Sequence, residues 1–245
     1  MRPGWSHTTD GRTREKKLLS LKRKLERYVN ILDAIKERKS IRRFKPGPVP
    51  REKIEEILSL AIRAPSAINL QPWEFTVVIG EEKARLSRRL LKAYKERNIS
   101  CSPGSLKPLS KTFTARGVES FEGMKPFLDE MGCDFDRYIN EGSCDFYGAP
   151  VAIIICLDNA FSKARLVDIG AALGYLVLAA HSLGLWTCPI GLIAAYEDDV
   201  KDELNIPDEK RVVIAVALGH PDWESPINRF TSPRDRLDAF VRWME

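Results

Sequence analysis

The sequence predicts an α/β or α+β protein built around one mixed sheet. Three apolar, β-branched runs have the character of buried strands: Glu74–Ile79, Pro150–Leu157 and Arg211–Leu218. Segments with helical spacing lie between them, so the strands must pair in a single sheet that helices cover. With 245 residues, of which 44% are hydrophobic, the chain can bury a full core.

Apolar residues recur at three- and four-residue steps in five segments: Lys17–Arg38, Arg51–Arg63, Lys83–Glu96, Ala164–Leu183 and Asp198–Leu204. The first should break near Tyr28–Asn30, with Asn30 or Asp33 capping its second half. Trp186–Ile193 is a strand or loop around Pro189, and Leu237–Trp243 is a short terminal segment.

The segment Ala164–Leu183 is apolar on nearly all sides, which predicts a central helix. Gly170 and Gly174 within it would allow close approach of a second helix, and Gly184 suits its C-terminal cap. Asp168 and His181 flank or interrupt the apolar run, which is shorter than a typical span of about 20 residues. A buried helix is therefore favoured over a membrane span, and His181 is interpreted as a satisfied core residue.

Residues 100–143 form an insert in which the helical pattern degrades. Glycines and prolines punctuate it throughout, which predicts mixed loop and short helix. Long irregular inserts often serve as lids over a site. The aromatic residues of this insert favour a segment that packs against or covers something, and Phe121 and Phe127 are candidates for contact with a substrate.

The net charge of +5 is mild and partly concentrated in residues 1–27, which we interpret as a basic arm or helix preceding a domain at residues 28–245. No aromatic residues alternate with these cations in the manner of a nucleic-acid surface, so a solvated helix is favoured over a nucleic-acid or membrane contact. Five cysteines without a CxxC pair argue against disulfides and zinc. No apolar leader is present, and a cytoplasmic location is the expectation.

Several familiar kinds of site are not indicated. No GxGxxG follows a strand and no GxxxxGK[ST] occurs, so neither a Rossmann nor a P-loop site is predicted. The three histidines have no metal-ligand spacing, and no Ser–His–Asp arrangement can be built. Cys188 is interpreted as a small buried hydrophobe.

Two short motifs carry the functional information. Arg38–Phe44 places cations and a hydroxyl on a turn at the end of a helix, where they can hold a phosphate and an anionic edge. Ala64–Trp73 is a loop of small, hydrogen-bonding residues that opens into a strand, so a ring could approach it closely. Together they suit a flat, polar-edged ligand with a phosphate tail.

These motifs, at this separation, resemble those of the FMN-dependent nitroreductase family, and the resemblance runs from about Tyr28 to Trp243. It implies an α+β sandwich in which helices flank a central mixed, mainly antiparallel sheet. It also implies an interlocked homodimer with two active sites at the interface, and FMN as cofactor with NADH or NADPH as reductant.

The resemblance assigns cofactor roles by matching position. Arg38 should reach the phosphate, Lys39 and Ser40 the ribityl–phosphate region, and Arg42 the N1/O2 edge of the ring. The second subunit should donate residues from one loop: Pro65, Ser66, Ala67, Asn69 and Gln71.

Two further segments match the family. Pro189, Ile190 and Gly191 match the backbone that faces flavin N5, although many members carry an acidic residue where this chain has Ile190. Arg234 is the better match, and Arg236 the second, to a basic element that closes on the phosphate. No side chain is expected to act as a catalytic nucleophile, because the flavin carries the hydride.

The resemblance thus implies ping-pong reduction of a small electron-poor acceptor, such as a nitroaromatic or a quinone, by NAD(P)H. Two alternatives stay open. One is another reaction on the same scaffold, such as reductive dehalogenation or flavin fragmentation. The other is a flavin-binding or interaction protein without enzymatic activity.

Overall fold

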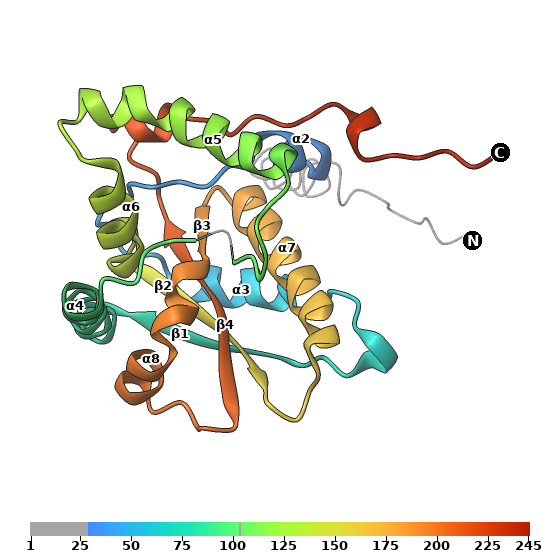
Figure 1. Cartoon of the computed structure of the whole chain (residues 1–245). Helices are drawn as coiled ribbons and strands as arrows, with labels where there is room; N and C mark the ends of the chain where they lie inside the picture. Colours follow the sequence, from blue (N-terminus) through green and yellow to red (C-terminus); the bar gives the residue numbers. More distant parts are fainter. Residues whose placement is uncertain (1–28, 103) are drawn as a thin grey trace, which may run out of the picture.

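The computed structural model describes residues 29–102 and 104–245, which form an α+β sandwich around one sheet (Figure 1). Four strands pair antiparallel in the order β1-β2-β4-β3. They are β1 (Trp73–Ile79), β2 (Val151–Asp158), β3 (Trp186–Ile190) and β4 (Lys210–Gly219). The predicted strands are therefore confirmed. A parallel contact is made by the isolated bridge between Ser40 and Thr187.

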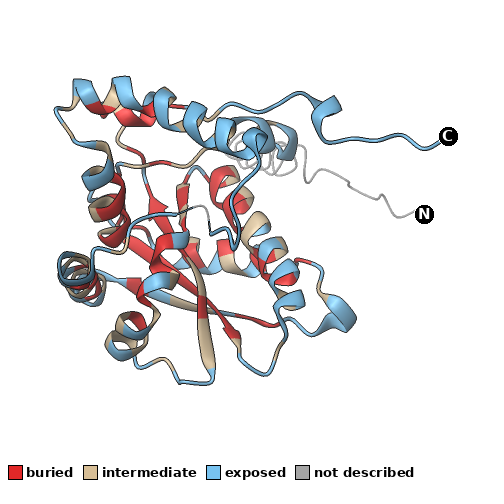
Figure 2. Ribbon diagram, in the orientation of Figure 1, coloured by how far each residue is buried: buried red, intermediate tan, exposed pale blue. Residues whose placement is uncertain are grey.

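The central strand β2 explains why its sequence is a continuous apolar run. Its residues alternate between the two faces of the sheet, and both faces are covered. Ala152 and Ile154 belong to a core shared with α4 (Gly80–Arg97), α6 (Phe135–Cys144) and α8 (Glu197–Leu204). Ile153 and Ile155 belong to a core shared with α3 (Arg51–Ala61) and α7 (Leu166–Ser182). Figure 2 shows burial concentrated on the sheet and on the helix faces turned toward it.

Helix α7 is the predicted apolar helix, and it packs against α3 and the sheet. Together with the preceding turn it is long and apolar enough to cross a membrane, but its buried residues include Ala172, Leu176 and Ala180, as expected of a core helix. Gly170 and Gly174 face open space: a Cβ at either would meet no described atom within 4 Å. The close helix approach that these glycines suggested is therefore not made within the described chain.

Helix α2 (Ile31–Glu37) begins at the predicted cap. The Asn30 side-chain oxygen accepts from the backbone N–H groups of Leu32 (3.0 Å) and Asp33 (3.1 Å). The helix ends at Arg38, so the cationic motif starts where the helix stops. Its exposed residues include three large apolar side chains, Ile31, Leu32 and Ile35. The predicted basic arm and the first part of the Lys17–Arg38 helix lie outside the described residues.

The prediction of mixed loop and short helix for residues 100–143 is wrong in one respect, because the insert contains a long helix. Most of it is helical, with α5 (Lys111–Glu130) followed by α6. The glycines and the proline of α5 suggested breaks because each costs helix stability, roughly 1 kcal/mol for a glycine. Tertiary burial outweighs that cost: Met124 and Leu128 are buried in a cluster with Ile139, Ile227 and Phe230.

Candidate functional site

The Arg38–Phe44 segment runs along the edge of the sheet, between β3 and the loop after β4. The N–H of Ile41 donates to the carbonyl of Thr187 (3.1 Å), and the N–H of Phe44 donates to the carbonyl of Tyr147 (3.2 Å). Ile41 and Phe44 are buried. These two anchors leave Arg38, Ser40 and Arg42 half-buried on the outer side.

A buried amide fixes the middle of this segment. The Asn228 side-chain oxygen accepts from the N–H of Arg42 (2.9 Å), and its Nδ2 donates to the carbonyls of Arg43 (2.7 Å) and Asp222 (2.8 Å). The Tyr138 hydroxyl donates to the carbonyl of Arg42 (2.7 Å). Sequence reasoning missed Asn228 and Tyr138, because neither belongs to a motif and their partners are distant in the chain.

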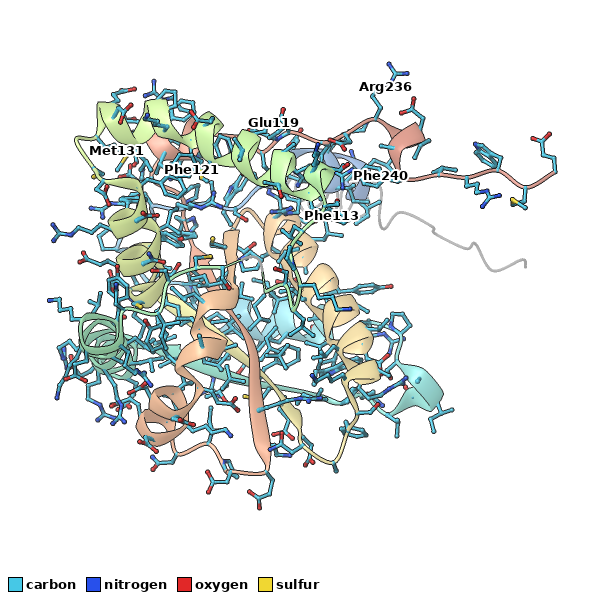
Figure 3. The ribbon with its side chains drawn as sticks, in the orientation of Figure 1. Phe113, Glu119, Phe121, Met131, Arg236 and Phe240 are labelled. Atoms are coloured by element: carbon cyan, nitrogen blue, oxygen red, sulfur yellow. The ribbon has the colours of Figure 1, made fainter. Side chains whose placement is uncertain are left out.

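The predicted phosphate residues converge from two parts of the chain. Arg38 lies close enough to Arg234 that burial and repulsion between the two guanidinium groups lower the pKa of Arg38. Nζ of Lys39 lies 3.4 Å from both the carbonyl of Arg229 and the hydroxyl of Thr231, and burial lowers its pKa. Arg236 is not brought in: it is exposed and lies 3.6 Å from Asp238 (Figure 3).

These cations lack counter-ions among the described residues. Arg38, Lys39, Arg42 and Arg234 take part in no ion pair with a described carboxylate, although many other cations of the chain do. Nε of Arg38 is buried without a described hydrogen-bond partner. Buried donors are normally satisfied. The cluster therefore fits a dianionic phosphate, which would supply the missing acceptors.

The end of β3 lies next to the Arg38–Arg42 segment. Cys188 is buried, and burial raises the pKa of its thiol, while the nearby Arg42, Ser40 and Arg38 oppose the shift. The interpretation of Cys188 as a buried hydrophobe is thus confirmed, and the residue places Pro189–Gly191 next to the Arg38–Arg42 segment. Ile190 is buried and ends the strand, and Gly191 is exposed at the start of the next turn.

A cavity of about 250 Å³ opens beside Arg42. Its lining includes Arg42, Arg43, Leu91, Tyr138, Glu141 and Tyr147. Burial raises the pKa of Tyr138 to about 12 and raises that of Tyr147 as well. Both phenols therefore stay protonated at neutral pH and can act as hydrogen-bond donors.

The Pro65–Gln71 loop is not brought to this cluster within one chain. It protrudes near the start of α7, whereas Arg38 lies near the other end of that helix (Figure 1). Ile68 is 90% exposed and has a φ of 44°, a left-handed conformation that is costly for a β-branched residue. Such strain often marks a functional contact.

The two candidate substrate residues pack against other aromatic rings. The ring centroids of Phe121 and Phe135 lie 4.1 Å apart, and Phe121 remains partly exposed. The Phe127 ring lies 6.4 Å from that of Phe230, with the Arg229 guanidinium 5.5 Å from its centroid. Phe127 therefore faces the packed side of α5.

The comparisons with known proteins agree with this geometry. Residues 35–220 match the model of the nitroreductase family. A chloronitrobenzene nitroreductase of Comamonas testosteroni is 33% identical over 221 residues, which cover 86% of this chain and 96% of the relative. An iodotyrosine deiodinase of Thermotoga neapolitana is 29% identical over 198 residues, covering 80% and 91%.

Among solved structures, the FMN-dependent nitroreductase NfnB from Mycobacterium smegmatis, in complex with NADPH, aligns with a TM-score of 0.78 at 28% identity. The alignment covers 87% of this chain and 97% of that one. Fold and site thus define a nitroreductase-type flavoprotein scaffold. The chain belongs to the nitroreductase family, which confirms the family, the fold class and the kind of enzyme predicted from the sequence.

His181 of α7 lies near Glu37 and Arg38, at the start of the cationic segment. It is buried, as predicted, but it is not satisfied: its ring nitrogens have no described hydrogen-bond partner, and Nε2 lies 3.7 Å from a carboxylate oxygen of Glu37. The Trp186 ring lies edge-on at 4.3 Å between centroids. Burial and the nearby Arg38 lower the pKa of His181, and Glu37 opposes them.

This lowered pKa predicts a pH-dependent stability. Below the ordinary histidine pKa of about 6.5, the unfolded chain binds a proton more readily than the folded chain does. The free energy of unfolding should therefore fall as the pH drops from 6.5 through the folded pKa. Urea denaturation at pH 8 and pH 5 should show a smaller pH difference for His181→Phe than for wild type. Exposed His220→Gln is the control, and an unchanged difference in His181→Phe contradicts the assignment.

Proposed function

We propose that this protein reduces small electron-poor acceptors with NADH or NADPH, using FMN held at the Arg38–Arg42 segment. The observation that carries the proposal is the cluster of cations without described counter-ions, in which Arg38, Lys39 and Arg42 are half-buried and Arg234 is exposed. Relatives described as nitroreductases support the acceptor class, and the FMN and NADPH named for NfnB support the cofactors. When bound, FMN supplies the carrier that accepts a hydride from the nucleotide and passes electrons on.

In this proposal the chain's own groups orient the cofactor and stabilise its charge. Arg38, Ser40 and Arg234 hold the phosphate, with Lys39 beside them, whereas Arg236 lies outside this group, next to Asp238. Arg42 faces the N1/O2 edge, where it stabilises negative charge that develops on reduction. Its position is well defined because Asn228 and Tyr138 hold its backbone. The backbone of Pro189, Ile190 and Gly191 provides the donor toward N5.

The second half of the site is proposed to come from a second copy of the chain. Pro65, Ser66, Ala67, Asn69 and Gln71 lie on a protruding loop that makes no contribution to its own cationic cluster. Within it the Ser66 hydroxyl accepts from the N–H of Gln71 (3.0 Å), which fixes the loop's shape. The exposed apolar faces of α2 and α7, with Ile31 and Tyr175 among them, support a homodimer interface.

Phe121 and Phe127 are proposed to border the acceptor. Phe121 is the partly exposed member of the pair, so it is the better placed to contact a ring.

Reductive dehalogenation is the second candidate function, and the similarity to the iodotyrosine deiodinase is the observation that favours it. The same cofactor seat would serve either reaction, and the acceptor decides between them.

Purified protein should be yellow, should bleach anaerobically with NADH or NADPH, and should regain its colour on addition of a nitroaromatic. Protein that stays oxidised in the presence of both nucleotides contradicts the proposal. Recovery with an iodophenol and release of iodide, but no recovery with nitroaromatics, supports the second candidate.

In the same assay Phe121→Ala should change kcat/KM for the acceptor more than for the nucleotide.

Arg38→Ala combined with Ser40→Ala should strip the flavin. Charge-assisted hydrogen bonds contribute about 1.5–3 kcal/mol each, so the affinity for FMN should fall roughly a hundredfold or more. Fluorescence titration of deflavinated protein gives the dissociation constant. Riboflavin, which lacks the phosphate, should be affected far less, and exposed Lys45→Ala provides a matched cation control. Equal losses for FMN and riboflavin contradict the phosphate assignment.

Replacing Asn69 and Gln71 with alanine should lower FMN affinity without changing the cationic cluster of the same chain. Dilution that separates the subunits should release flavin, because each site would lose the loop of its partner. Sedimentation velocity with detection at a flavin wavelength follows both quantities together. A monomer that retains FMN is the result that rejects a shared site.

A further inference from the structure

Helix α5 and the C-terminal segment 229–240 lie alongside each other, at the top of the molecule in Figure 1. The two segments run in opposite directions, so the end of one contacts the start of the other. Glu130, at the end of α5, pairs with Arg229, whereas Arg116, near its start, pairs with Asp235, its Nε lying 2.8 Å from Oδ2. The α5 partners are 14 positions apart, which corresponds to roughly 21 Å of helix. The tail partners are six positions apart, which corresponds to about 20 Å of extended chain, so the two segments match in length.

Between these two ion pairs, the helix and the tail are in close contact. A Cβ added to Gly123 of α5 would lie 2.9 Å from the Phe230 ring, so glycine allows the tail to approach the helix closely. At the far end, the Arg116 guanidinium lies 4.8 Å from the centroid of the Phe240 ring and 5.5 Å from that of Phe113. Figure 3 shows Phe113 and Phe240 at this end of the helix.

The tail has little else to hold it. From Thr231 to Asp235 its backbone makes no described backbone–backbone hydrogen bond, and it belongs to no described strand. Ordering such a segment costs roughly 1–2 kcal/mol for each residue. It also carries Arg234 toward Arg38, and the two guanidinium groups repel each other. Side-chain contacts with α5 must therefore oppose both effects.

We propose that α5 holds the C-terminal segment in place at the phosphate site, and that Arg116 is the positioning residue that keeps Arg234 beside Arg38. The inference rests on the proposed phosphate role of Arg234. Arg116 itself does not touch the phosphate. It acts by pinning Asp235, the neighbour of Arg234, and by covering Phe240. This gives the insert at residues 100–143 a role in the cofactor site.

Titration of deflavinated full-length protein with FMN and with riboflavin tests the proposal. Arg116→Ala and Asp235→Asn should each weaken FMN binding about three- to tenfold, as expected for losing a partly exposed ion pair, and Arg116→Ala also loses the contact with the Phe240 ring. Riboflavin binding should not change. Arg116→Lys, which keeps the charge, should restore most of the FMN affinity. Arg88→Ala, which removes an exposed ion pair with Glu81 on α4, is the matched control and should bind FMN like wild type.

The double variant Arg116→Ala with Arg234→Ala separates positioning from general destabilisation. If Arg116 acts through Arg234, the double variant binds FMN no more weakly than Arg234→Ala alone. Additive losses contradict the positioning role of Arg116, as does normal FMN affinity in both Arg116→Ala and Asp235→Asn. If Arg234→Ala weakens FMN binding and those two variants do not, the phosphate role of Arg234 is supported and only the positioning role of Arg116 is rejected. If Arg234→Ala also binds FMN normally, both roles are rejected.

Discussion

The cationic cluster imposes the constraint on which the rest of the site depends. The exposed Arg234 lies close to the half-buried Arg38 of a distant segment, and neither guanidinium group has a described carboxylate partner. Such an arrangement is unfavourable alone, so the surrounding structure must hold it in place. Asn228 and Tyr138 fix the backbone of one segment, and contacts with α5 order the other. A binding site prepared in this way gains affinity because the anion need not organise it.

The fold could be predicted wherever local sequence and burial agree. The run Val151–Leu157 is apolar throughout because both faces of its strand are covered, and Asn30 is one of the two caps that the sequence predicted. The helix α5 could not be predicted, because Gly117, Gly123 and Pro126 lower its intrinsic helix stability. Its packing against Phe230 comes from a residue about a hundred positions away, and no local pattern reports that contact.

Prediction of the site met a similar limit. Arg38, Ser40, Arg42 and Arg234 could be proposed because they fall in recognisable motifs, and the structure brings Arg234 to Arg38 while leaving Arg236 in solvent. The roles of Asn228, His181 and Arg116 could not be proposed. Each depends on a partner in another element, so its meaning appears only when the chain is folded. The proposed cofactor contacts fall in short sequence motifs, whereas the groups that position them do not.

The protruding loop around Ile68 has a consequence for inheritance. In the proposed homodimer, this loop completes the neighbouring subunit's site, and the site of its own chain is completed by the loop of the other copy. A substitution in this loop would weaken cofactor binding in the partner's site rather than in the site of its own chain. In a cell that makes both forms of the chain, a mixed dimer of loop-defective and Arg38-defective subunits would keep one intact site. Two alleles that are each inactive would then complement one another, and neither defect could be read from one subunit alone.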